Sequence, residues 1–579
     1  MGGPIKKDRV FFFGGYQHTE ADTGFVPTAQ SLAHLPDALN LISGERTAEN
    51  LFQAFRATNP KFTLTDPSQI DPLAVKLFNL RNPETGDFVI GAPAGRPFTG
   101  SRRVDATGNP LSLVRQVFPA RFEQDQFNLK SDVQISSLNR LSASFFFADY
   151  PGFDPFQDPS SLASPFTLER EDQARTLSVT DIHTFGPTVT NEARFGFHLL
   201  DNSRLLDPKF DSLTNEAVGV PNPATQFDDS IATRRLGHYV FRGPRFSFGG
   251  PNDTYNQRDQ QSFSLSDTVS VFRGKHSFRV GGEWKRHRYN TYLPEEQATE
   301  FEKFSSFDQL LRGWAQEGDT QYGFTNKSFR MTDLSWFVAD DWKLTPKLTL
   351  NLGLRWDWFG WPAEEDGRIG NLDFSRLSDT ENPLSTFIVP SNVQTTAFDA
   401  VNSAVNASYR ADTEHTLSGQ DWNNLQPRVG FAYSPLASGR LLIRGGYGMS
   451  YDRPSAAFMN TVSSNYPFLR EIEVTYRVPI GGAFSQQDTK LGFERYLPMR
   501  VVFTGGKSGN YQIRDNTGVT AGADGTTNPI DPSTDQPFRG NIAETFEIRA
   551  VDRNLRTPCV QQWNLGIPSG KLRLSVTGL

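Results

Sequence analysis

The chain has 579 residues, too many for one ordinary soluble core, so it forms either several domains or one large closed barrel. Apolar residues make up only 37% of it while aromatic residues reach 12%, which disfavours disorder of the whole chain and fits a barrel with a wet lumen, where every second strand residue can be polar. The net charge of −7 without a long basic run argues against a nucleic-acid partner, and the single cysteine, Cys559, excludes an internal disulfide framework and a Cys-rich zinc site.

The first 120 residues predict one short strand and a long loop. Residues 1–9 form an exposed lead-in, Val10 to Tyr16 form a short strand, and 17–120, rich in Pro, Asn, Gly and Asp, form a loop with room for one short helix between Ser31 and Arg56. No apolar signal segment follows Met1, and no run of about 18 apolar residues occurs, so no transmembrane helix is predicted. In a membrane, the chain would have to form a closed barrel, since only helices and closed barrels satisfy their backbone groups in lipid.

Residues 121–452 are predicted to form hairpins with long loops. Apolar and polar side chains alternate there with period two, which indicates strands with one apolar face. The alternating apolar residues are Phe127, Leu129, Val133, Ile135, Leu177, Val179, Phe185, Ala193, Phe195, Phe197, Leu199, Phe263, Leu265, Val269, Val271, Phe278, Val280, Trp284, Val429, Phe431, Tyr433, Leu441, Ile443, Tyr447, Met449 and Tyr451. Tight turns join the arms at Leu138-Asn139, Gly186-Pro187, Gly274-Lys275, Thr345-Pro346 and Ser438-Gly439.

The clearest hairpin spans Leu334 to Phe359. In its second arm the even positions from Leu348 to Trp358 are apolar and the odd positions are Thr, Asn, Gly, Arg and Asp. The first arm repeats this pattern, with Asp340 the one polar residue on the apolar side. Each arm is longer than the roughly five or six residues usual in soluble sheets and reaches the roughly nine to eleven that a tilted strand needs to cross a bilayer. Tryptophans gather at the far end of the second arm, where an aromatic girdle would lie.

Long segments separate the hairpins at one end only. Loops are predicted at about 201–256, 291–327, 361–424 and 453–557, and a last hairpin at 558–579 turns at Pro568-Ser569-Gly570. Such loops are uncommon in compact soluble domains, whereas short periplasmic turns and long extracellular loops are typical of outer-membrane barrels. The pattern therefore predicts an all-β fold, an antiparallel transmembrane β-barrel. Turns 186–190, 273–276, 345–347 and 437–440 should face the periplasm, and loops 201–256, 361–424 and 453–557 should face outward.

Six phrases carry a resemblance to a known family. They are GGPIKKDRVFFFGGYQ at 2–17, GKHSFRVGGEWKR at 274–286, FVADDWKLTPKLTLNLGLRWD at 337–357, DWNNLQPRVGFAYSP at 421–435, LLIRGGYGMSYDR at 441–453 and VQQWNLGI at 560–567. They resemble, in family order, the barrel of TonB-dependent receptors of the Oar-like branch, whose members carry a carboxypeptidase-regulatory-like domain. In that branch a GGPI segment such as that at 2–5 follows the plug and opens the barrel.

The resemblance implies a 22-strand barrel with an N-terminal plug, preceded by a carboxypeptidase-regulatory-like β-sandwich, that imports bulky nutrients with energy passed on by TonB. About twelve to fourteen candidate strands are readable here. A signal peptide, the sandwich, the plug with its TonB-contacting box, the closing strands and the terminal aromatic residue are not found. Residues 1–579 are therefore expected to be a partial, incomplete barrel. Its expected partners are outer-membrane lipid, lipopolysaccharide and an unknown bulky ligand, with the TonB system reached only through a plug outside these residues.

Four features could suggest site chemistry. His276 and His287 would lie on opposite faces of one strand, so they form no metal pair, and Asp340 and Asp341 are split in the same way. Asp515 to Asp535 has enough oxygen ligands for calcium but lacks the spacing of an EF-hand, which favours a plain solvated loop. Gly445-Gly446 with Gly448 lies within a strand and has no following helix, so these glycines are expected to relieve crowding on the lumen face rather than bind a dinucleotide.

No nucleophile elbow or phosphate loop is found, so the chain is not expected to be an enzyme, and no catalytic, cofactor-binding or metal-binding residue is assigned. The ligand-binding residues stay unknown, because loops determine the ligand. The function expected is that of an outer-membrane receptor and transporter barrel in a Gram-negative-type bacterium. Two alternatives stay open: a plugless porin or adhesin-type barrel, and a secreted all-β binding protein.

Overall fold

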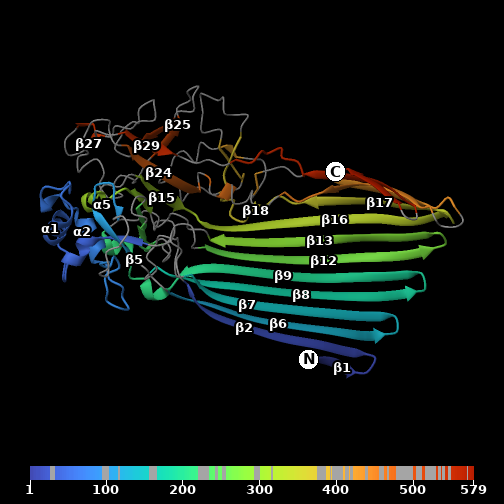
Figure 1. The fold of residues 1–579 in the computed structure, drawn as a ribbon. Helices are drawn as coiled ribbons and strands as arrows, with labels where there is room; N and C mark the ends of the chain where they lie inside the picture. Colours follow the sequence, from blue (N-terminus) through green and yellow to red (C-terminus); the bar gives the residue numbers. More distant parts are fainter. Residues whose placement is uncertain are drawn as a thin grey trace.

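The structure is a computed structural model and describes residues 1–25, 33–93, 103–114, 118–154, 166–219, 234–241, 246–250, 256–292, 300–313, 317–373, 387–391, 393, 409–410, 416–417, 421–436, 441–454, 462–463, 465, 468–477, 500–503, 511–514, 530–531, 536–537, 541–545, 550–569 and 572–578. One 15-stranded sheet dominates the fold, and we name it the wall (Figure 1). All its neighbouring strands pair antiparallel, and consecutive strands are neighbours throughout.

The wall is built, in spatial order, from β1 (Gly2–Lys6), β2 (Val10–Phe25), β6 (Phe118–Ser136), β7 (Asn139–Asp154), β8 (Leu168–Gly186), β9 (Val189–Leu206), β12 (Asn256–Arg273), β13 (His276–Tyr292), β16 (Asn326–Thr345), β17 (Leu348–Phe359), β22 (Leu425–Tyr433), β23 (Ile443–Tyr451), β30 (Cys559–Ser569) and β31 (Leu572–Gly578), with the short β18 (Ala363–Glu364) paired to β16. Its longest strand has 20 residues, well beyond the length needed to cross a bilayer.

The hairpin register follows the alternation in the sequence. Four of the expected turns are tight: β6 ends at Ser136 and β7 begins at Asn139, and the other three lie at 186–189, 273–276 and 345–348. Gly274 has φ +60°, a conformation that glycine adopts without strain. The expected turn at 437–440 lies outside the described residues.

The two sides of the wall differ in chemistry. On the apolar face, one register row runs across five strands through Leu129, Phe145, Leu177, Phe197 and Phe263. On the polar face, the corresponding row one position further contains Ser144, Ser178, Gly196, Ser264 and Lys285.

The apolar face has little packed against it. Leu129, Val280 and Val338 are 43%, 53% and 38% exposed. A soluble protein rarely leaves so wide an apolar face open, so this face needs an apolar surrounding.

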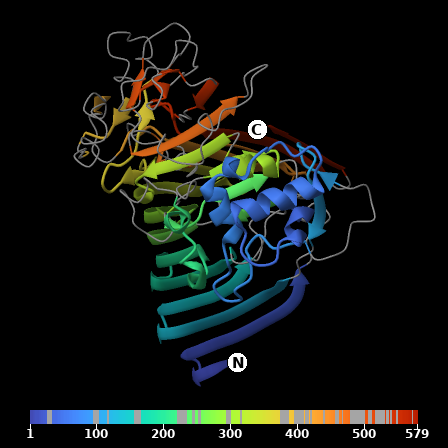
Figure 2. The same cartoon turned by 90° about the vertical axis from the view of Figure 1, so that its left-hand side faces the viewer.

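A second folded layer, which we name the cap, lies at the end of the wall opposite the tight turns (Figure 1). It consists of β3 (Ala33–Pro36), η1 (Asp37–Leu41), α1 (Ala48–Thr58), η2 (Pro67–Gln69), α2 (Pro72–Asn79), β4 (Arg103–Val104), β5 (Pro110–Val114), η3 (Pro208–Phe210), α3 (Asn215–Val218), β10 (His238–Phe241), β11 (Phe246–Gly249), β14 (Glu300–Phe304) and α5 (Phe307–Arg312). Seen from the loop end, the wall is curved and the helices of the cap lie within its curve (Figure 2).

The cap corrects the expected boundaries of the first loop. The strand expected at Val10–Tyr16 runs to Phe25, and β6 begins at Phe118, so the strands extend into both ends of 17–120. Between them, the described residues of that segment contain helices and short strands. The helix expected between Ser31 and Arg56 is α1, capped by Thr47, and a second helix, α2, is capped by Asp71. The helix α2 was missed because its 8 residues show too few turns for a clear apolar side.

The other long segments also contain short elements. Residues 201–256 and 291–327 supply part of the cap and β15 (Glu317–Gly323), which pairs with β24 (Leu469–Arg477), itself paired with β29 (Asn541–Thr545). The remaining strands are β19 (Asn371–Leu372), β20 (Phe387–Val389), β21 (Tyr409–Arg410), β25 (Arg500–Phe503), β26 (Tyr511–Arg514), β27 (Ile530–Asp531) and β28 (Gln536–Pro537). Among the described residues, no helix is long and apolar enough to cross a membrane.

Candidate ligand-binding site at the loop end

The cap has a continuous hydrophobic core. Leu51 and Phe55 of α1, Leu77 and Phe78 of α2 and Phe307 of α5 are fully buried in one cluster. Phe55 and Phe307 have ring centroids 6.3 Å apart although they lie far apart in the sequence. The same cluster takes in Leu168 and Leu206, at the outer ends of β8 and β9. The cap is therefore packed onto the wall as well as onto itself.

Two buried carboxylates hold the cap segments together. Asp105 Oδ2 accepts hydrogen bonds from Phe307 N and Asn109 Nδ2, both at 2.8 Å, and Asp308 Oδ2 accepts from Thr63 N at 2.9 Å and Thr63 Oγ1 at 2.6 Å. Asn109 Nδ2 also donates to Asp308 Oδ1 at 2.6 Å, so one amide bridges both carboxylates. These bonds join the segment after β2 to the segment after β13, and they satisfy charges that would otherwise be costly to bury.

Arg46 connects the end of α2 to the segment around Ile90. It is 2% exposed, and its Nη1 donates to the carbonyl oxygens of Phe78 at 2.8 Å and Ile90 at 2.6 Å. The Phe88 ring lies 3.9 Å from its guanidinium carbon and 4.0 Å from that of Arg81. Burial, and secondarily the Arg81 charge, lowers the pKa of Arg46 to about 10, so it stays charged at neutral pH.

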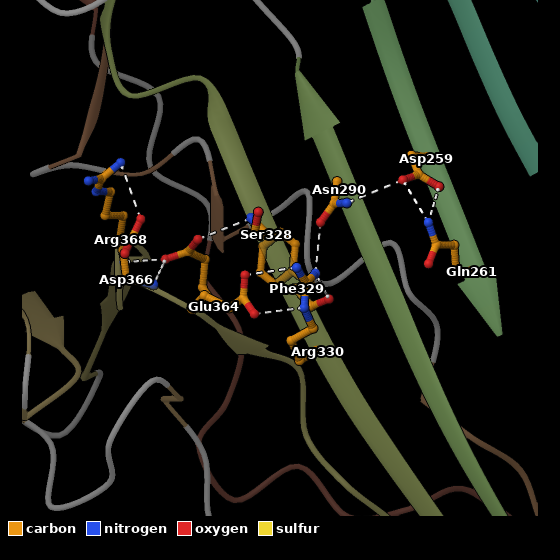
Figure 3. Close-up of polar contacts among 10 residues, drawn as sticks. Asp259, Gln261, Asn290, Ser328, Phe329, Arg330, Glu364, Asp366 and Arg368 are labelled. Atoms are coloured by element: carbon orange, nitrogen blue, oxygen red, sulfur yellow. Dashed lines mark hydrogen bonds and ion pairs between the residues drawn. The ribbon is translucent and has the colours of Figure 1, made fainter. Parts of the chain in front are cut away.

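A loop after β17 is clamped onto the outer end of β16. Glu364 is 1% exposed, and its carboxylate accepts hydrogen bonds from the backbone N of Ser328, Asp366 and Arg368 at 3.0, 3.0 and 2.7 Å (Figure 3). The buried Lys327 donates from Nζ to the carbonyl oxygen of Arg368 at 2.7 Å. The loop 361–373 is thereby held against the wall.

A second chain of polar contacts crosses three strands beside this clamp (Figure 3). Arg330 on β16 binds both carboxylate oxygens of Glu365, at 2.9 and 2.8 Å, and donates to Asn290 Oδ1 on β13 at 2.7 Å. Asn290 Nδ2 donates to Asp259 Oδ2 on β12 at 3.3 Å. Bidentate contacts of this kind fix geometry as well as adding energy.

On the polar face, Asp333 is the centre of a third group. Arg453 Nη1 contacts its two oxygens at 2.8 and 2.6 Å, and Arg453 Nη2 donates to the carbonyl oxygen of Gly360 at 3.1 Å. His287 Nε2 lies 3.3 Å from Asp333 Oδ2, and its Nδ1 lies 2.8 Å from Ser262 Oγ. A Ser–His–Asp sequence of contacts therefore exists, but the Arg453 guanidinium occupies the carboxylate, so the group serves as a structural connection between strands and loop.

Two adjoining clefts open at this point, and both are lined by Trp361 and Pro362. The first is also lined by Asp421, Arg453 and Leu555. The second is mainly apolar, and its other lining residues include Ile369, Leu417, Val462 and Val551. Charged side chains also line the second cleft, Asp552 and Arg553, so both clefts combine apolar surface with a few charged groups, the combination that orients a ligand. We name the pair the Trp361 clefts.

The described part of the chain answers two of the expectations about side chains. His276 and His287 lie on opposite faces: His276 stacks on Phe278 at 5.2 Å and contacts Asp340 at 2.7 Å, while His287 faces Asp333. Asp341 points away from Asp340 and accepts from Asn351. In the residues that the structure describes, no group of three or more His, Cys, Asp or Glu side chains is arranged to hold a metal ion.

The expectation for the glycines of β23 is partly wrong. Gly445 lies on the apolar face opposite Phe431, and a Cβ at Gly445 would meet the Phe431 ring at 2.8 Å, so the crowding is not on the lumen side. Gly446 and Gly448, on the polar face, have no atom closer than 3.6 Å to such a Cβ. Of the candidate calcium loop at 515–535, only 530–531 are described, so that loop lies outside the described residues.

The model of one protein family, the outer membrane beta barrel domain, matches residues 1–569. The chain belongs to this family of outer-membrane β-barrels. This barrel domain therefore lies in the bacterial outer membrane, and the exposed apolar face of its wall is the membrane-facing side. The polar face is the lumen side, so the cap packs on lumen-facing residues.

Solved outer-membrane transporters and receptors resemble this barrel domain. The copper transporter OprC is 9% identical with a TM-score of 0.33 over 81% of this chain and 52% of its own. The alcaligin outer-membrane receptor FauA from Bordetella pertussis is 9% identical, with a TM-score of 0.30 over 80% and 56%. The RagAB peptide importer is 9% identical, with a TM-score of 0.31 over 98% and 53%. The chain thus spans about half the length of these proteins. No curated protein matches it.

Proposed function

We propose that this barrel domain is the membrane-spanning, ligand-capturing part of a TonB-dependent receptor of the Oar-like branch, and that it takes up a bulky ligand bound first at the Trp361 clefts. The observation that carries the proposal is that described parts of the long loops fold into a cap and a cleft-bearing surface over the lumen side. A passive porin needs an open lumen rather than such a roof. The six receptor-like phrases in the hairpins support the same interpretation.

The division of the chain follows from this proposal. Residues 121–452 supply most of the wall, 453–557 extend outward, and 558–579 form a last hairpin of a partial barrel. The wall's two outermost strands, β1 and β31, each pair with one strand among the described residues. We propose that further strands, toward the family's 22, complete the barrel in a longer receptor, and that TonB acts through a plug outside these residues.

Replacing Trp361 with alanine is expected to reduce uptake of the ligand about tenfold or more, because a buried aromatic anchor often contributes about 2 kcal/mol or more to binding. The host bacterium lacking this protein would be complemented with the wild type or Trp361→Ala, and growth measured on peptides, glycans and metal chelates too bulky for general porins. Loss of one class of nutrient, reproduced by loss of TonB, is the expected result.

Trp422→Ala is the matched control for this experiment. Trp422 is 56% exposed, stacks on Trp358 with ring centroids 4.8 Å apart, and lines neither cleft. Its loss should leave uptake unchanged. Uptake that serves small solutes and does not respond to TonB would instead favour the alternative, a plugless porin. Wild-type growth of the deletion strain on all bulky nutrients, with retained surface adhesion, would favour an adhesin-type barrel.

An epitope inserted between Glu84 and Thr85 is expected to bind antibody on intact cells. This turn of the cap is exposed, and a Cβ at the neighbouring Gly86 would have no atom within 4 Å, so the turn has room for an insertion. The proposed orientation places the cap outside and the turn at Thr345-Pro346 in the periplasm. A tag at Thr345-Pro346 should therefore be detected only after permeabilisation. The reverse result would invert the orientation.

A further inference from the structure

The membrane-facing side of β13 changes from apolar to cationic near its outer end. Val280 and Trp284 are exposed on that side, and the same parity continues with Arg286 and Arg288. At about 3.3 Å per residue, these arginines lie about 7 and 13 Å beyond Trp284 along the strand. In the register, Trp284 pairs with Leu334, which pairs with Trp358 on β17, and Trp336 on β16 lies two positions from Leu334, so aromatic residues mark the boundary of the apolar zone. The two arginines are thus at the level of lipid headgroups.

Like charges meet at this position. Arg288 pairs in register with Arg330, and such directly opposite like charges destabilise a sheet unless something neutralises them. Arg330 is satisfied by both oxygens of Glu365. Arg286 donates from Nη1 to the neutral Thr332 Oγ1 at 2.8 Å, and Arg288 lies over the Phe263 ring at 5.7 Å.

Within the described residues, neither Arg286 nor Arg288 has a carboxylate at ion-pair distance. Asp259, the acidic residue on the same side of the neighbouring strand β12, accepts hydrogen bonds from Gln261 and Asn290.

The cationic patch is local. At the outer ends of β6, β7 and β9, the same side of the wall carries Asp125, Asp149 and Asp201 along one register row, with Arg175 the nearby cation on β8. An anion approaching the wall from the membrane is therefore favoured at β13 and disfavoured over most of β6 to β9. Arginine is suited to phosphate, because its planar fork can bind two oxygens at once.

We propose that Arg286 and Arg288 form a binding site for the phosphate of an anionic lipid of the outer leaflet, a lipopolysaccharide whose acyl chains lie along Val280, Trp284 and Leu334. The occupant follows from what this side of β13 presents in a protein of the outer membrane: two guanidinium groups that have no carboxylate partner among the described residues, directly outside an exposed apolar stripe. The inference rests on the proposed function only for the orientation, in which the cap end faces outward.

The test measures lipid retained by the full chain. Protein reconstituted in phosphatidylcholine vesicles containing diphosphoryl lipid A would be extracted in mild detergent and purified, and the bound lipid A quantified per protein by mass spectrometry. Arg286→Gln/Arg288→Gln is expected to retain roughly tenfold less lipid A or lower, because hydrogen bonds to a charged partner are lost at both residues. Inorganic phosphate as a soluble competitor should not displace the lipid, since it lacks the acyl chains.

Lys285→Gln is the matched control. Lys285 lies between Trp284 and Arg286 on the same strand, but it faces the lumen and pairs with Glu283 at 3.0 Å. This variant should retain lipid A as the wild type does. Folding of every variant is checked by heat-modifiable gel mobility. If the double variant fails to fold, the single variant Arg288→Gln, at an exposed position, takes its place in the test. An equal loss in Lys285→Gln, or wild-type retention in both arginine variants, overturns the proposal.

Two further measurements distinguish a wrong lipid-binding site from a wrong orientation of the barrel. Vesicles with phosphatidylglycerol in place of lipid A should give little retention, and equal retention of both lipids overturns a specific outer-leaflet ligand. Retention of lipid A that depends on the arginines supports the site even where the uptake experiment fails. Conversely, a cap epitope detected outside together with unchanged retention in the variants overturns the site alone.

Discussion

Val280→Arg is expected to destabilise the folded protein in a bilayer by about 2–4 kcal/mol, the usual cost of a lipid-facing arginine near the midplane of a barrel. Val280 is 53% exposed on the membrane-facing side, between the turn at Gly274 and Trp284. Its register partners, Val269 and Val338, are apolar, so an introduced guanidinium finds no counter-charge beside it. The measurement is the free energy of unfolding by denaturant after folding into lipid vesicles.

Three variants serve as controls. Leu352→Arg, on the same side, should be less harmful than Val280→Arg, because Leu352 pairs in register with Asp340 and an arginine there can reach that carboxylate. Asn351→Arg points into the lumen next to Asp341 and should cost under about 1 kcal/mol. Val280→Phe should be tolerated, since lipid yields to a larger side chain, whereas overpacking a tight core costs about 1–3 kcal/mol. If Val280→Phe is as harmful as Val280→Arg, this side of the wall faces packed protein rather than lipid.

Asp308→Ala is expected to reduce the stability of the cap by about 3 kcal/mol, because it removes the acceptor of Thr63 N and Thr63 Oγ1 and one of the acceptors of the buried Asn109 amide. Asp308 is 1% exposed, so water cannot readily replace the carboxylate. Hydrogen exchange of the α1 and α2 amides should rise strongly, while exchange in β12 and β13 stays as in the wild type. The readout thus locates the damage in the cap.

Asp87→Ala is the control for the buried carboxylate. Asp87 is exposed at a turn of the cap, and a surface substitution of this kind usually changes stability by less than about 0.5 kcal/mol. Protection of α1 and α2 that is unchanged in Asp308→Ala would mean that the hydrophobic core alone holds the cap, and that the Asp105–Asn109–Asp308 contacts are incidental.

The wall could be predicted from the sequence because the alternation of apolar and polar residues is visible within each single strand. Apolar residues at every second position from Leu348 to Trp358 fix which side each residue faces, and the turn at Thr345-Pro346 fixes the register with β16. Single residues could still mislead: Asp340 lies on the apolar face because His276, from the neighbouring hairpin turn, contacts it at 2.7 Å. That partner is not visible in the alternation.

The cap and the Trp361 clefts could not be predicted in this way. Thr63 and Asp308 are 245 positions apart, and Glu364 meets the backbone of Ser328 through a loop with no periodicity. A helix as short as α2 shows too few turns for a clear apolar side. The arginines of β13 were visible as Trp284, Arg286 and Arg288 on one parity, but their meaning depends on Arg330 lying opposite, which only the register reveals.

The span of the cap's contacts has a consequence for the order of assembly. Hairpins such as β12–β13 close over a few residues, so they can form early, whereas contacts between distant residues form slowly because a long loop must first be ordered. Asp308 follows β13 in the chain, yet its partners Thr63 and Asn109 lie between β2 and β6. We therefore expect the cap to close only after the wall from β2 to β13 is in place, which would make formation of the Thr63–Asp308 hydrogen bonds a kinetic marker of a finished wall.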